Sequence, residues 1–356
     1  MKAGWTAADI PVLDGRTAVV TGATGGIGFA VARALAARGA HVVLAARHAD
    51  RGARAAVLIG QDVPGASTEV GVLDLASLAS VRRFAAVFGE RHERLDILVN
   101  NAGIAGGPRR ETADGFEAHF GVNHLGHFAL TGLLLGSLGP GSRVVTMSTG
   151  LAARARIDFA DPQSRRRYRM TAAYGQSKLA QLMFAVELDR RLRSGAAGAG
   201  SFAAHPGVAR TRLMSGRHAD WGRGAGLAET AVRATQLLFG AAPDAAALPC
   251  LYQATDPAAD SSVYVGTRGH MRGHPAVCAI PPAALDAAAA ARLWEISAEL
   301  TGVGYDLLRS RLSARARRAL IAESGVIARD SAIKAAGPAQ PVVATARERI
   351  AAWIFC

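Results

Sequence analysis

The stretch Thr21-Gly22-Ala23-Thr24-Gly25-Gly26-Ile27-Gly28 decides the fold of this 356-residue chain. A β-rich run, residues 16–20, precedes it, and a helical pattern follows over residues 29–38 and ends at Gly39. A glycine-rich turn between a strand and a helix is typical of dinucleotide binding, because glycines let the backbone approach the pyrophosphate and the helix N-terminus favours its charge. A P-loop is disfavoured, since no Lys-Ser/Thr pair follows the last glycine, whereas a plain tight turn stays open as the structural alternative.

Strand-like and helical segments alternate along the chain, and this alternation predicts a parallel sheet with helices on both faces. The expected strands are residues 16–20, 41–46, 68–73, 95–99, 142–147, 201–204 and 262–265. We therefore predict an α/β fold, a single doubly wound parallel sheet of the Rossmann type with about seven strands. This domain should occupy residues 1–312 and include a substrate lid near residues 209–226. The Ala/Arg-rich residues 313–356 should form an appended tail, partly helical or disordered.

Composition limits the classes of function. The net charge of +13 comes from arginine spread through the chain, and no aromatic residues interleave with its densest runs, so we expect no nucleic-acid partner. No stretch is long and apolar enough for a membrane span, and residues 1–9 lack the apolar core of a signal peptide. Cys250, Cys278 and Cys356 are odd in number and widely spaced, which indicates neither a disulfide framework nor a zinc knuckle and favours a reducing, cytoplasmic location.

The stretch Tyr174-Gly175-Gln176-Ser177-Lys178 places a phenol and an ammonium one turn apart on the same face of an expected helix. A cation beside a phenol favours the phenolate and lowers the tyrosine pKa from its usual value of about 10. The pattern alone is weak, because helices produce it by chance as a packed tyrosine and a solvated lysine. However, Lys2, Lys178 and Lys334 are the only lysines of an arginine-rich chain, so a compact ammonium at this position favours a catalytic pair.

Polar residues follow several expected strands at their carboxyl ends, where open α/β sheets bind ligands. Arg47 follows the second strand, in a region where NAD-preferring folds usually have an acid and this chain has none. We therefore predict NADP as the cofactor, with NAD less favoured, and Arg47 as the cation for the 2′-phosphate. Asp74-Leu75, Asn100-Asn101-Ala102-Gly103 and Ser148 follow later strands, although ordinary turn chemistry is the alternative for the first two.

Asn123 is an amide inside an otherwise apolar helical segment, so we expect it either to bend the helix or to have a buried polar partner. His124 and His127 lie beside it and raise the question of a metal site. No carboxylate or third ligand stands near them in the sequence, so we predict no metal-binding residues.

Together these motifs resemble those of the short-chain dehydrogenase/reductase family, and the resemblance covers residues 14–306. The residues that carry it are Thr21 to Gly28, which match the family's Thr-Gly-x-x-x-Gly-x-Gly, Asn100 to Gly103, which match its Asn-Asn-Ala-Gly, Pro206-Gly207, and the tetrad Asn123, Ser148, Tyr174 and Lys178. Arg47 and the long segment between Ser148 and Tyr174 are similar to the retinol dehydrogenase and protochlorophyllide reductase-like branch.

The resemblance implies an NADP(H)-dependent oxidoreductase that transfers a hydride between nicotinamide and a carbonyl or alcohol group of a hydrophobic small molecule. Tyr174 would be the general acid/base, Lys178 would lower its pKa and bind the nicotinamide ribose, Ser148 would hold the substrate oxygen, and Asn123 would anchor a water. The implied cofactor-binding residues are Gly22, Thr24, Gly25, Gly26, Ile27, Gly28, Arg47, Asp74, Leu75, Asn101, Ala102, Gly103, Tyr174, Lys178, Pro206, Gly207, Val208 and Thr211. Family members often pair through their long helices, so we expect a homo-oligomer, a dimer or a tetramer.

Two other classes of function stay open at this point. A cofactor-binding regulatory or scaffold protein without turnover would have the same fold, although the intact tetrad argues against it. An epimerase or dehydratase that uses transient oxidation usually carries a larger C-terminal substrate domain than the residues after Val208 provide. Single-turnover oxidation of NADPH separates the first alternative from an active reductase.

Overall fold

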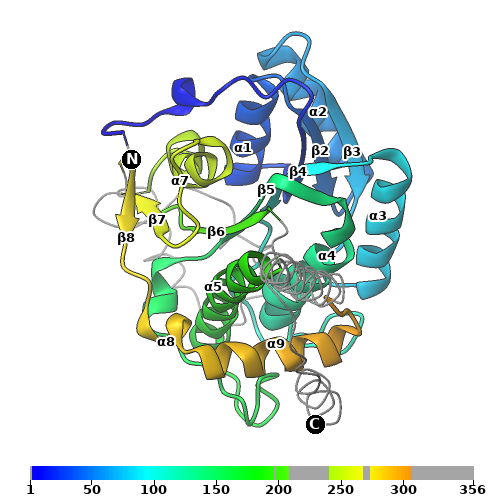
Figure 1. Ribbon diagram of the computed structural model, residues 1–356. Coiled ribbons are helices and arrows are strands. Elements are labelled where there is room, and N and C mark those ends of the chain that lie inside the picture. The colour runs from blue at the N-terminus through cyan, green and yellow to red at the C-terminus, as the bar shows by residue number, and fades with distance from the viewer. Residues whose placement is uncertain (1, 196–197, 208–239, 268–272, 306–356) are drawn as a thin grey trace, which may run out of the picture. The chain divides into compact units, whose positions relative to one another are not determined.

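The computed structural model describes residues 2–195, 198–207, 240–267 and 273–305 (Figure 1). The chain divides into two units, Met1–Arg309 and Ser310–Cys356, and all described residues belong to the first. One sheet runs through this unit, with its strands in the order β3-β2-β1-β4-β5-β6-β7-β8. The strands are β1 (Thr17–Thr21), β2 (His41–Ala46), β3 (Thr68–Val72), β4 (Leu95–Asn100), β5 (Leu138–Met147), β6 (Gly200–Ala204), β7 (Tyr264–Thr267) and β8 (Pro275–Cys278).

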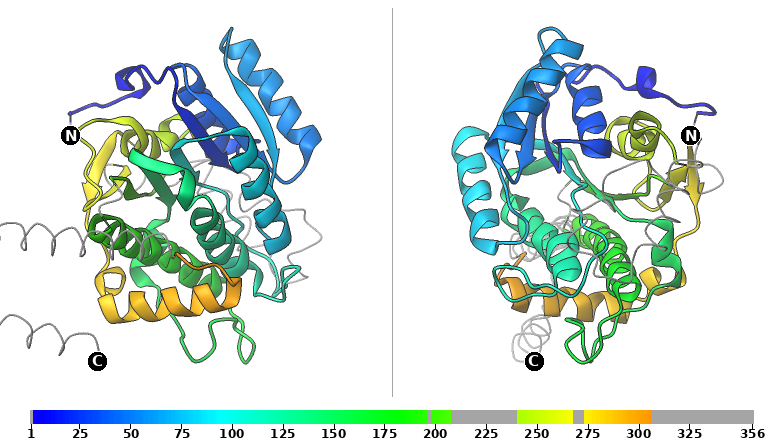
Figure 2. Two further views of the ribbon diagram at one scale, coloured as in Figure 1. Left: turned by 45° about the vertical axis from the view of Figure 1, so that its right-hand side comes forward. Right: turned by 180° about the vertical axis from the view of Figure 1, so that it is seen from behind.

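Helices cover both faces of the sheet (Figure 2). They are α1 (Gly26–Ala36), α2 (Ala49–Asp62), α3 (Leu78–Arg91), a π-helix (Phe120–Leu125), α4 (Gly126–Leu133), α5 (Met170–Ser194), α7 (Pro243–Thr255), α8 (Pro282–Leu285) and α9 (Ala287–Thr301). Short 3₁₀ turns lie at Ala7–Asp9, Leu135–Ser137 and Gly150–Arg154. None of the helices in the described ranges combines the length with the hydropathy that a bilayer crossing requires.

Two hydrophobic cores lie on opposite faces of the sheet, because successive residues of a strand point to opposite sides. Val20 of β1 packs in the core that includes Val31 of α1 and Leu251 of α7. Its neighbour Val19 packs in the other core with Phe128 of α4. Every residue of β4 is buried, as expected for a parallel strand in the middle of a sheet covered on both faces.

The order of the strands reverses between β1 and β4, which are parallel neighbours although β2 and β3 come between them in the sequence. At such a switch point the connections after the two strands diverge and leave a crevice outside their carboxyl ends. The glycine turn after β1 and the Asn-Asn-Ala-Gly turn after β4 therefore face each other at this edge of the sheet.

The predicted doubly wound parallel sheet is confirmed, and its strand count is corrected from about seven to eight. The additional strand, β8, pairs with β7 in the antiparallel direction, with Val277 opposite Val265. The sequence analysis did not predict it, because four residues with one exposed valine carry too little periodicity to distinguish an edge strand from a loop. The expected last strand is also shifted, from residues 262–265 to Tyr264–Thr267.

The helical segment around Asn123 and the start of β5 differ from the predicted elements. The helical segment expected around Asn123 is divided into a π-helix and α4, and β5 begins at Leu138 rather than at residue 142. The predicted lid at residues 209–226, the tail at residues 313–356, and the domain boundary at residue 312 lie outside the described residues.

The glycine turn allows a test of the fold with a matched control. A Cβ atom at Gly28 would lie 2.4 Å from the carbonyl oxygen of Gly22 and 2.5 Å from Nδ2 of Asn101, whereas one at Gly25 would meet no atom within 4 Å. We expect Gly28→Ala to destabilise the protein by about 1–3 kcal/mol through overpacking, and Gly25→Ala to leave stability nearly unchanged. Chemical denaturation of both variants measures the difference, and equal stabilities would contradict this account of the turn.

Candidate active site

The four residues of the predicted tetrad lie at the carboxyl edge of the sheet and are all buried. Ser148 comes directly after β5, and its Oγ donates a hydrogen bond to the carbonyl oxygen of Lys178 (2.8 Å). Tyr174 and Lys178 lie in the first three turns of α5, and Asn123 lies in the π-helix that packs against α5. The structure therefore brings together side chains from three separate segments of the chain.

Lys178 extends toward the turn after β4. A Cβ atom at Gly103 would lie 3.4 Å from Nζ of Lys178 and 3.2 Å from Oδ1 of Asn123, so Gly103 lies next to both side chains. The Nζ atom donates hydrogen bonds to Oε1 of Gln181 (2.7 Å) and to the carbonyl oxygen of Met147 (3.2 Å). These acceptors hold the ammonium between β5 and the Asn-Asn-Ala-Gly turn.

Asn123 has the buried polar partners that its position in an apolar helix predicted as one of two alternatives. Its Oδ1 accepts a hydrogen bond from the amide of Ile104 (2.8 Å), and its Nδ2 donates to the Ile104 carbonyl (3.0 Å) and to Oγ of Ser177 (2.9 Å). The helix around it is widened to π geometry, which recurs at functional sites. Asn123 thus ties the segment after Gly103 to the helix that carries Tyr174.

Burial is the main influence on the pKa values of Tyr174 and Lys178. It raises the pKa of Tyr174 to about 12 and lowers the pKa of Lys178 to about 8, because low-dielectric surroundings disfavour each charged form. The expectation that Lys178 would lower the pKa of Tyr174 is not met in the chain by itself. The reason is geometric, since Nζ of Lys178 is directed to Gln181 and Met147, and within the described residues no hydrogen bond joins it to the tyrosine hydroxyl.

The hydroxyl of Thr21 connects the glycine turn to the rest of the site. Its Oγ1 accepts hydrogen bonds from the amides of Asn101 and Ala102 (both 2.9 Å) and lies 3.0 Å from Nε2 of His127. Nδ1 of His127 lies 2.8 Å from the carbonyl oxygen of Asn123 and must donate to it, and burial keeps the pKa of His127 at about 4. The neutral ring therefore accepts at Nε2, and the single proton of the Thr21 hydroxyl has two acceptors within reach, Nε2 of His127 and the carbonyl oxygen of Val99 (3.1 Å).

The glycine turn fits a nucleotide pyrophosphate. Gly22 and Gly26 have φ values of +69° and +56°, which a side chain would strain, so the turn needs glycine there. Helix α1 begins at Gly26 after Gly25, and among the described residues no side chain caps it. Its first amide groups, next to Thr24 and Ile27, are thus free to bind an anion.

The residues predicted to bind the adenosine end occupy the carboxyl ends of β2 and β3. Arg47 is exposed, and its Nε donates to Nε2 of His48 (3.2 Å) rather than to an acid. Asp74 accepts at Oδ1 from the amide of Ala76 (3.0 Å), so it stabilises its own turn, and Leu75 beside it is buried. The side-chain amide of Asn101 donates to the Thr21 carbonyl oxygen (2.9 Å), which gives this residue a structural role in addition to the predicted one.

The nicotinamide end is described only in part. Pro206 and Gly207 follow β6, and Gly207 has a φ of +69° and donates from its amide to Nδ1 of His205 (3.2 Å). Val208 and Thr211, which were also predicted to bind the cofactor, lie outside the described residues.

The sequence analysis missed a buried pair, Glu117 and His119, beside Tyr174. Glu117 Oε1 accepts hydrogen bonds from the amide and from Nδ1 of His119 (both 3.0 Å), and its Oε2 accepts from the amide of Phe120 (2.8 Å). The ring of His119 is edge-to-face with that of Tyr174, with centroids 6.0 Å apart. These bonds keep the pKa of Glu117 low although burial opposes them. The signal in the sequence was an acid and a histidine at the start of an apolar helix.

The long segment between Ser148 and Tyr174 is fastened to this pair. Gln163 Oε1 accepts from the amide of Glu117 (2.7 Å), and Tyr168 donates to the carbonyl oxygen of Gly107 (3.1 Å) and stacks on His119. The segment is therefore held as a wall beside Tyr174. Tyr264 on β7 belongs to the same region. Burial raises its pKa, and the hydroxyl of Ser148 is close enough to oppose part of that rise.

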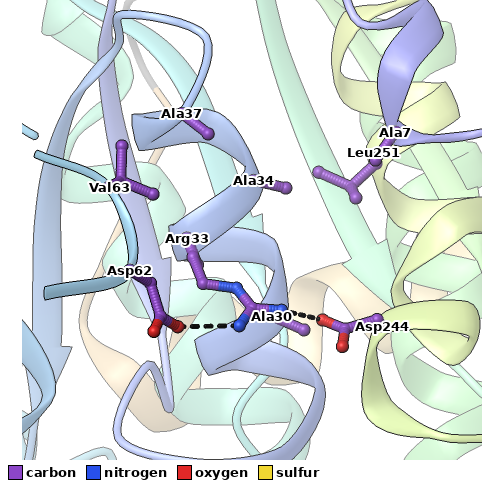
Figure 3. Close-up of a pocket in the computed structure, with 9 residues that line it drawn as sticks. All are labelled: Ala7, Ala30, Arg33, Ala34, Ala37, Asp62, Val63, Asp244 and Leu251. Carbon is purple, nitrogen blue, oxygen red and sulfur yellow. Dashed lines mark hydrogen bonds and ion pairs between the residues drawn. The ribbon is translucent and has the colours of Figure 1, made fainter. Parts of the chain in front are cut away.

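Two features carry no chemistry of this kind. Burial lowers the pKa of His124 to about 3, and its Nε2 lies 2.7 Å from the hydroxyl of Ser297, so it is a neutral core histidine. Figure 3 shows a cavity of about 450 Å³ beside α1, which contains none of the predicted site residues. Arg33 in this cavity is paired with Asp62 (2.8 Å) and Asp244 (2.6 Å), an arrangement that joins α1, α2 and α7.

Comparison with known sequences identifies the family. The sequence model described as short chain dehydrogenase matches residues 16–220, from the start of β1 to beyond the end of β6. The chain belongs to the short-chain dehydrogenase/reductase family. It is therefore an oxidoreductase that acts on alcohol or carbonyl groups.

Several relatives of this dehydrogenase belong to the retinol dehydrogenase-like branch. Retinol dehydrogenase 13 of Homo sapiens is 42% identical over 304 residues, which cover 84% of this chain and 88% of the relative. Polyprenol dehydrogenase of Mus musculus is 40% identical over 301 residues, covering 83% and 86%. A solved structure of an uncharacterized protein from Mycobacterium Paratuberculosis has a TM-score of 0.71 at 39% identity, covering 85% of this chain and 99% of that one.

The lowered pKa of Lys178 predicts how carbonyl reduction by this dehydrogenase depends on pH. Because the folded pKa is about 8, the ammonium is present below pH 8 and is lost as pH rises through it. We expect kcat/KM for NADPH, which reports the free enzyme, to fall above that pH and to approach a loss of about tenfold per further pH unit. Steady-state kinetics tests this, with the melting temperature at each pH as the control for unfolding. A profile that stays flat from about pH 7 to 9.5 would contradict the assignment.

Proposed function

We propose that this dehydrogenase transfers a hydride between NADP(H) and an apolar alcohol or aldehyde, with Tyr174 as general acid/base. The observation that carries the proposal is the convergence of Asn123, Ser148, Tyr174 and Lys178 at the carboxyl edge of the sheet, next to an uncapped helix N-terminus that suits a pyrophosphate. An anion site and a proton-transfer site on the same edge are what a nucleotide-dependent redox reaction needs.

Each member of the tetrad has a distinct role in this mechanism. The nicotinamide supplies or accepts the hydride when bound. During reduction Tyr174 donates its phenolic proton to the substrate oxygen, and during oxidation it takes that proton back. Ser148 releases the carbonyl oxygen of Lys178 and donates to the substrate oxygen, where negative charge develops. Asn123 holds α5 and the Ile104 segment in register, so that the phenol keeps its position.

The buried environment explains why the charge of Lys178 matters. Burial raises the pKa of Tyr174 to about 12, so the phenol is protonated at neutral pH and ready to act as an acid. Oxidation needs the phenolate instead, and a cation close to the hydroxyl favours it. Lys178 supplies such a cation once its ammonium turns from Gln181 toward the ribose and the phenol.

Arg47 supports NADP over NAD. Its guanidinium is exposed at the end of β2, its partner His48 is no acid, and residues 45–48 at the end of that strand contain no carboxylate for the ribose hydroxyls. The same position suits a 2′-phosphate, which guanidinium groups bind with charge-assisted hydrogen bonds.

The substrate class follows from the wall beside Tyr174 and from the names of the relatives. Three apolar side chains of the wall are Leu151, which is exposed, and Ile157 and Phe159, which pack against the core. Retinol and polyprenol, which the names of two relatives specify, are both apolar alcohols. An apolar alcohol or its aldehyde is therefore the substrate we propose.

Substitution of the general acid tests the mechanism. Tyr174→Phe removes only the hydroxyl, so we expect turnover of NADPH with apolar aldehydes to fall by about 100-fold or more while NADPH still binds. Single-turnover oxidation of NADPH and its fluorescence on binding measure the two effects. The control is Tyr252→Phe on α7, which removes a hydroxyl that donates to the carbonyl oxygen of Ala258. A wild-type protein that binds NADPH but oxidises none would favour a regulatory role.

A second variant tests the choice of cofactor. Arg47→Ala removes a phosphate contact of about 1.5–3 kcal/mol, so we expect KM for NADPH to rise by about 10- to 150-fold and KM for NADH to change little. Arg54→Ala, an exposed arginine further along α2, is the matched control. Equal changes for the two cofactors would rule out the phosphate contact.

A further inference from the structure

A cluster of two histidines and one glutamate lies at the amino edge of the sheet, on the side away from the tetrad. His41 is the first residue of β2, Glu69 is the second residue of β3, and His92 directly follows α3 (Figure 1). We call these three residues the His-Glu-His cluster. Their three ligand atoms lie within 4.8 Å of one another.

The distances within the His-Glu-His cluster suit a small tetrahedral ion. Oε2 of Glu69 lies 2.9 Å from Nε2 of His92 and 3.6 Å from Nε2 of His41. Ligand atoms bound tetrahedrally at zinc distances are about 3.3 Å apart, so both separations need to change by only a few tenths of an ångström. An ion at the centre would take the place of the hydrogen bond between His92 and Glu69.

His41 is oriented as a ligand before any ion binds. Its Nδ1 lies 2.7 Å from Oγ of Ser67, and a proton on Nδ1 leaves a lone pair on Nε2. That Nε2 atom is buried and has no hydrogen-bond partner within the described residues. A hydrogen bond that fixes the ring through its far nitrogen is the usual outer-shell arrangement of a zinc-bound histidine.

We propose that the His-Glu-His cluster binds one Zn²⁺ ion, with water as the fourth ligand. Two imidazoles and one carboxylate favour zinc over magnesium or calcium, which prefer sites made of oxygen alone. An ion can enter, because the three side chains are partly exposed and Glu69 and His92 line a cavity of about 260 Å³. The ion would join β2, β3 and α3 and stabilise this edge of the protein, separately from the catalytic reaction.

The positive charge of Arg91 disfavours an ion at the His-Glu-His cluster. Its Nη1 donates to Oε1 of Glu69 at 2.5 Å, and its positive charge lies next to the site. The arginine leaves Oε2 available but disfavours a divalent cation by repulsion. The alternative to a metal site is therefore a cluster of ion pairs in which Glu69 accepts hydrogen bonds from Arg91 and His92.

The test uses the full chain without a histidine tag, stripped with a chelator and titrated with ZnCl₂ by isothermal calorimetry. We expect one equivalent to bind and the melting temperature to rise with zinc. His41→Gln and His92→Gln should each weaken binding by about tenfold or more and abolish the rise. Glu93→Gln, an exposed acid that follows His92, is the matched control and should bind as the wild type does. Arg91→Gln should tighten binding, since it removes the opposing charge.

Three results would overturn the proposal. They are the absence of stoichiometric zinc binding, binding that survives His41→Gln unchanged, and a rise in melting temperature that both histidine variants share with the wild type. A tetrahedral absorption spectrum after Co²⁺ substitution, lost in His92→Gln, would support the geometry in a variant that still folds.

Discussion

The buried hydroxyl of Thr21 is the interaction on which the site depends most. It accepts from the amides of Asn101 and Ala102 and contacts the carbonyl oxygen of Val99 (3.1 Å) and Nε2 of His127 (3.0 Å). His127 in turn donates to the carbonyl oxygen of Asn123. Because Thr21 is fully buried, water does not compete for these bonds. One hydroxyl at the end of β1 thus fixes the glycine turn, the turn after β4 and the π-helix relative to one another.

Burial then sets the chemistry at the far end of this network. Asn123 passes the connection to Ser177, whose hydroxyl donates to the carbonyl oxygen of Tyr174 (2.8 Å). Desolvation favours the neutral forms of both Tyr174 and Lys178. The site is therefore sensitive to any charge that enters it, and a charged cofactor changes the protonation of its catalytic groups more than it would in water.

The two edges of the sheet hold different kinds of polar residues. At the carboxyl edge, hydrogen bonds join neutral groups such as Thr21, Asn101 and Asn123. At the amino edge, charged side chains pair directly, as where buried Asp96 accepts from Arg16 and Arg94 (both 2.7 Å). The His-Glu-His cluster belongs to this second edge, and its unpartnered nitrogen is what separates it from an ordinary ion pair.

The sequence by itself determined the α/β class, the glycine turn and the family, because these depend on local periodicity and on residue types at fixed spacing. It did not determine strand β8, the Glu117–His119 pair beside Tyr174, or the meeting of His41, Glu69 and His92. Those features join residues from different elements, and only the packing of the chain decides which side chains meet. The raised pKa of Tyr174 in the chain by itself has the same origin, because spacing along a helix places a lysine nearby, whereas tertiary burial and the acceptors on Gln181 and Met147 decide how its charge acts.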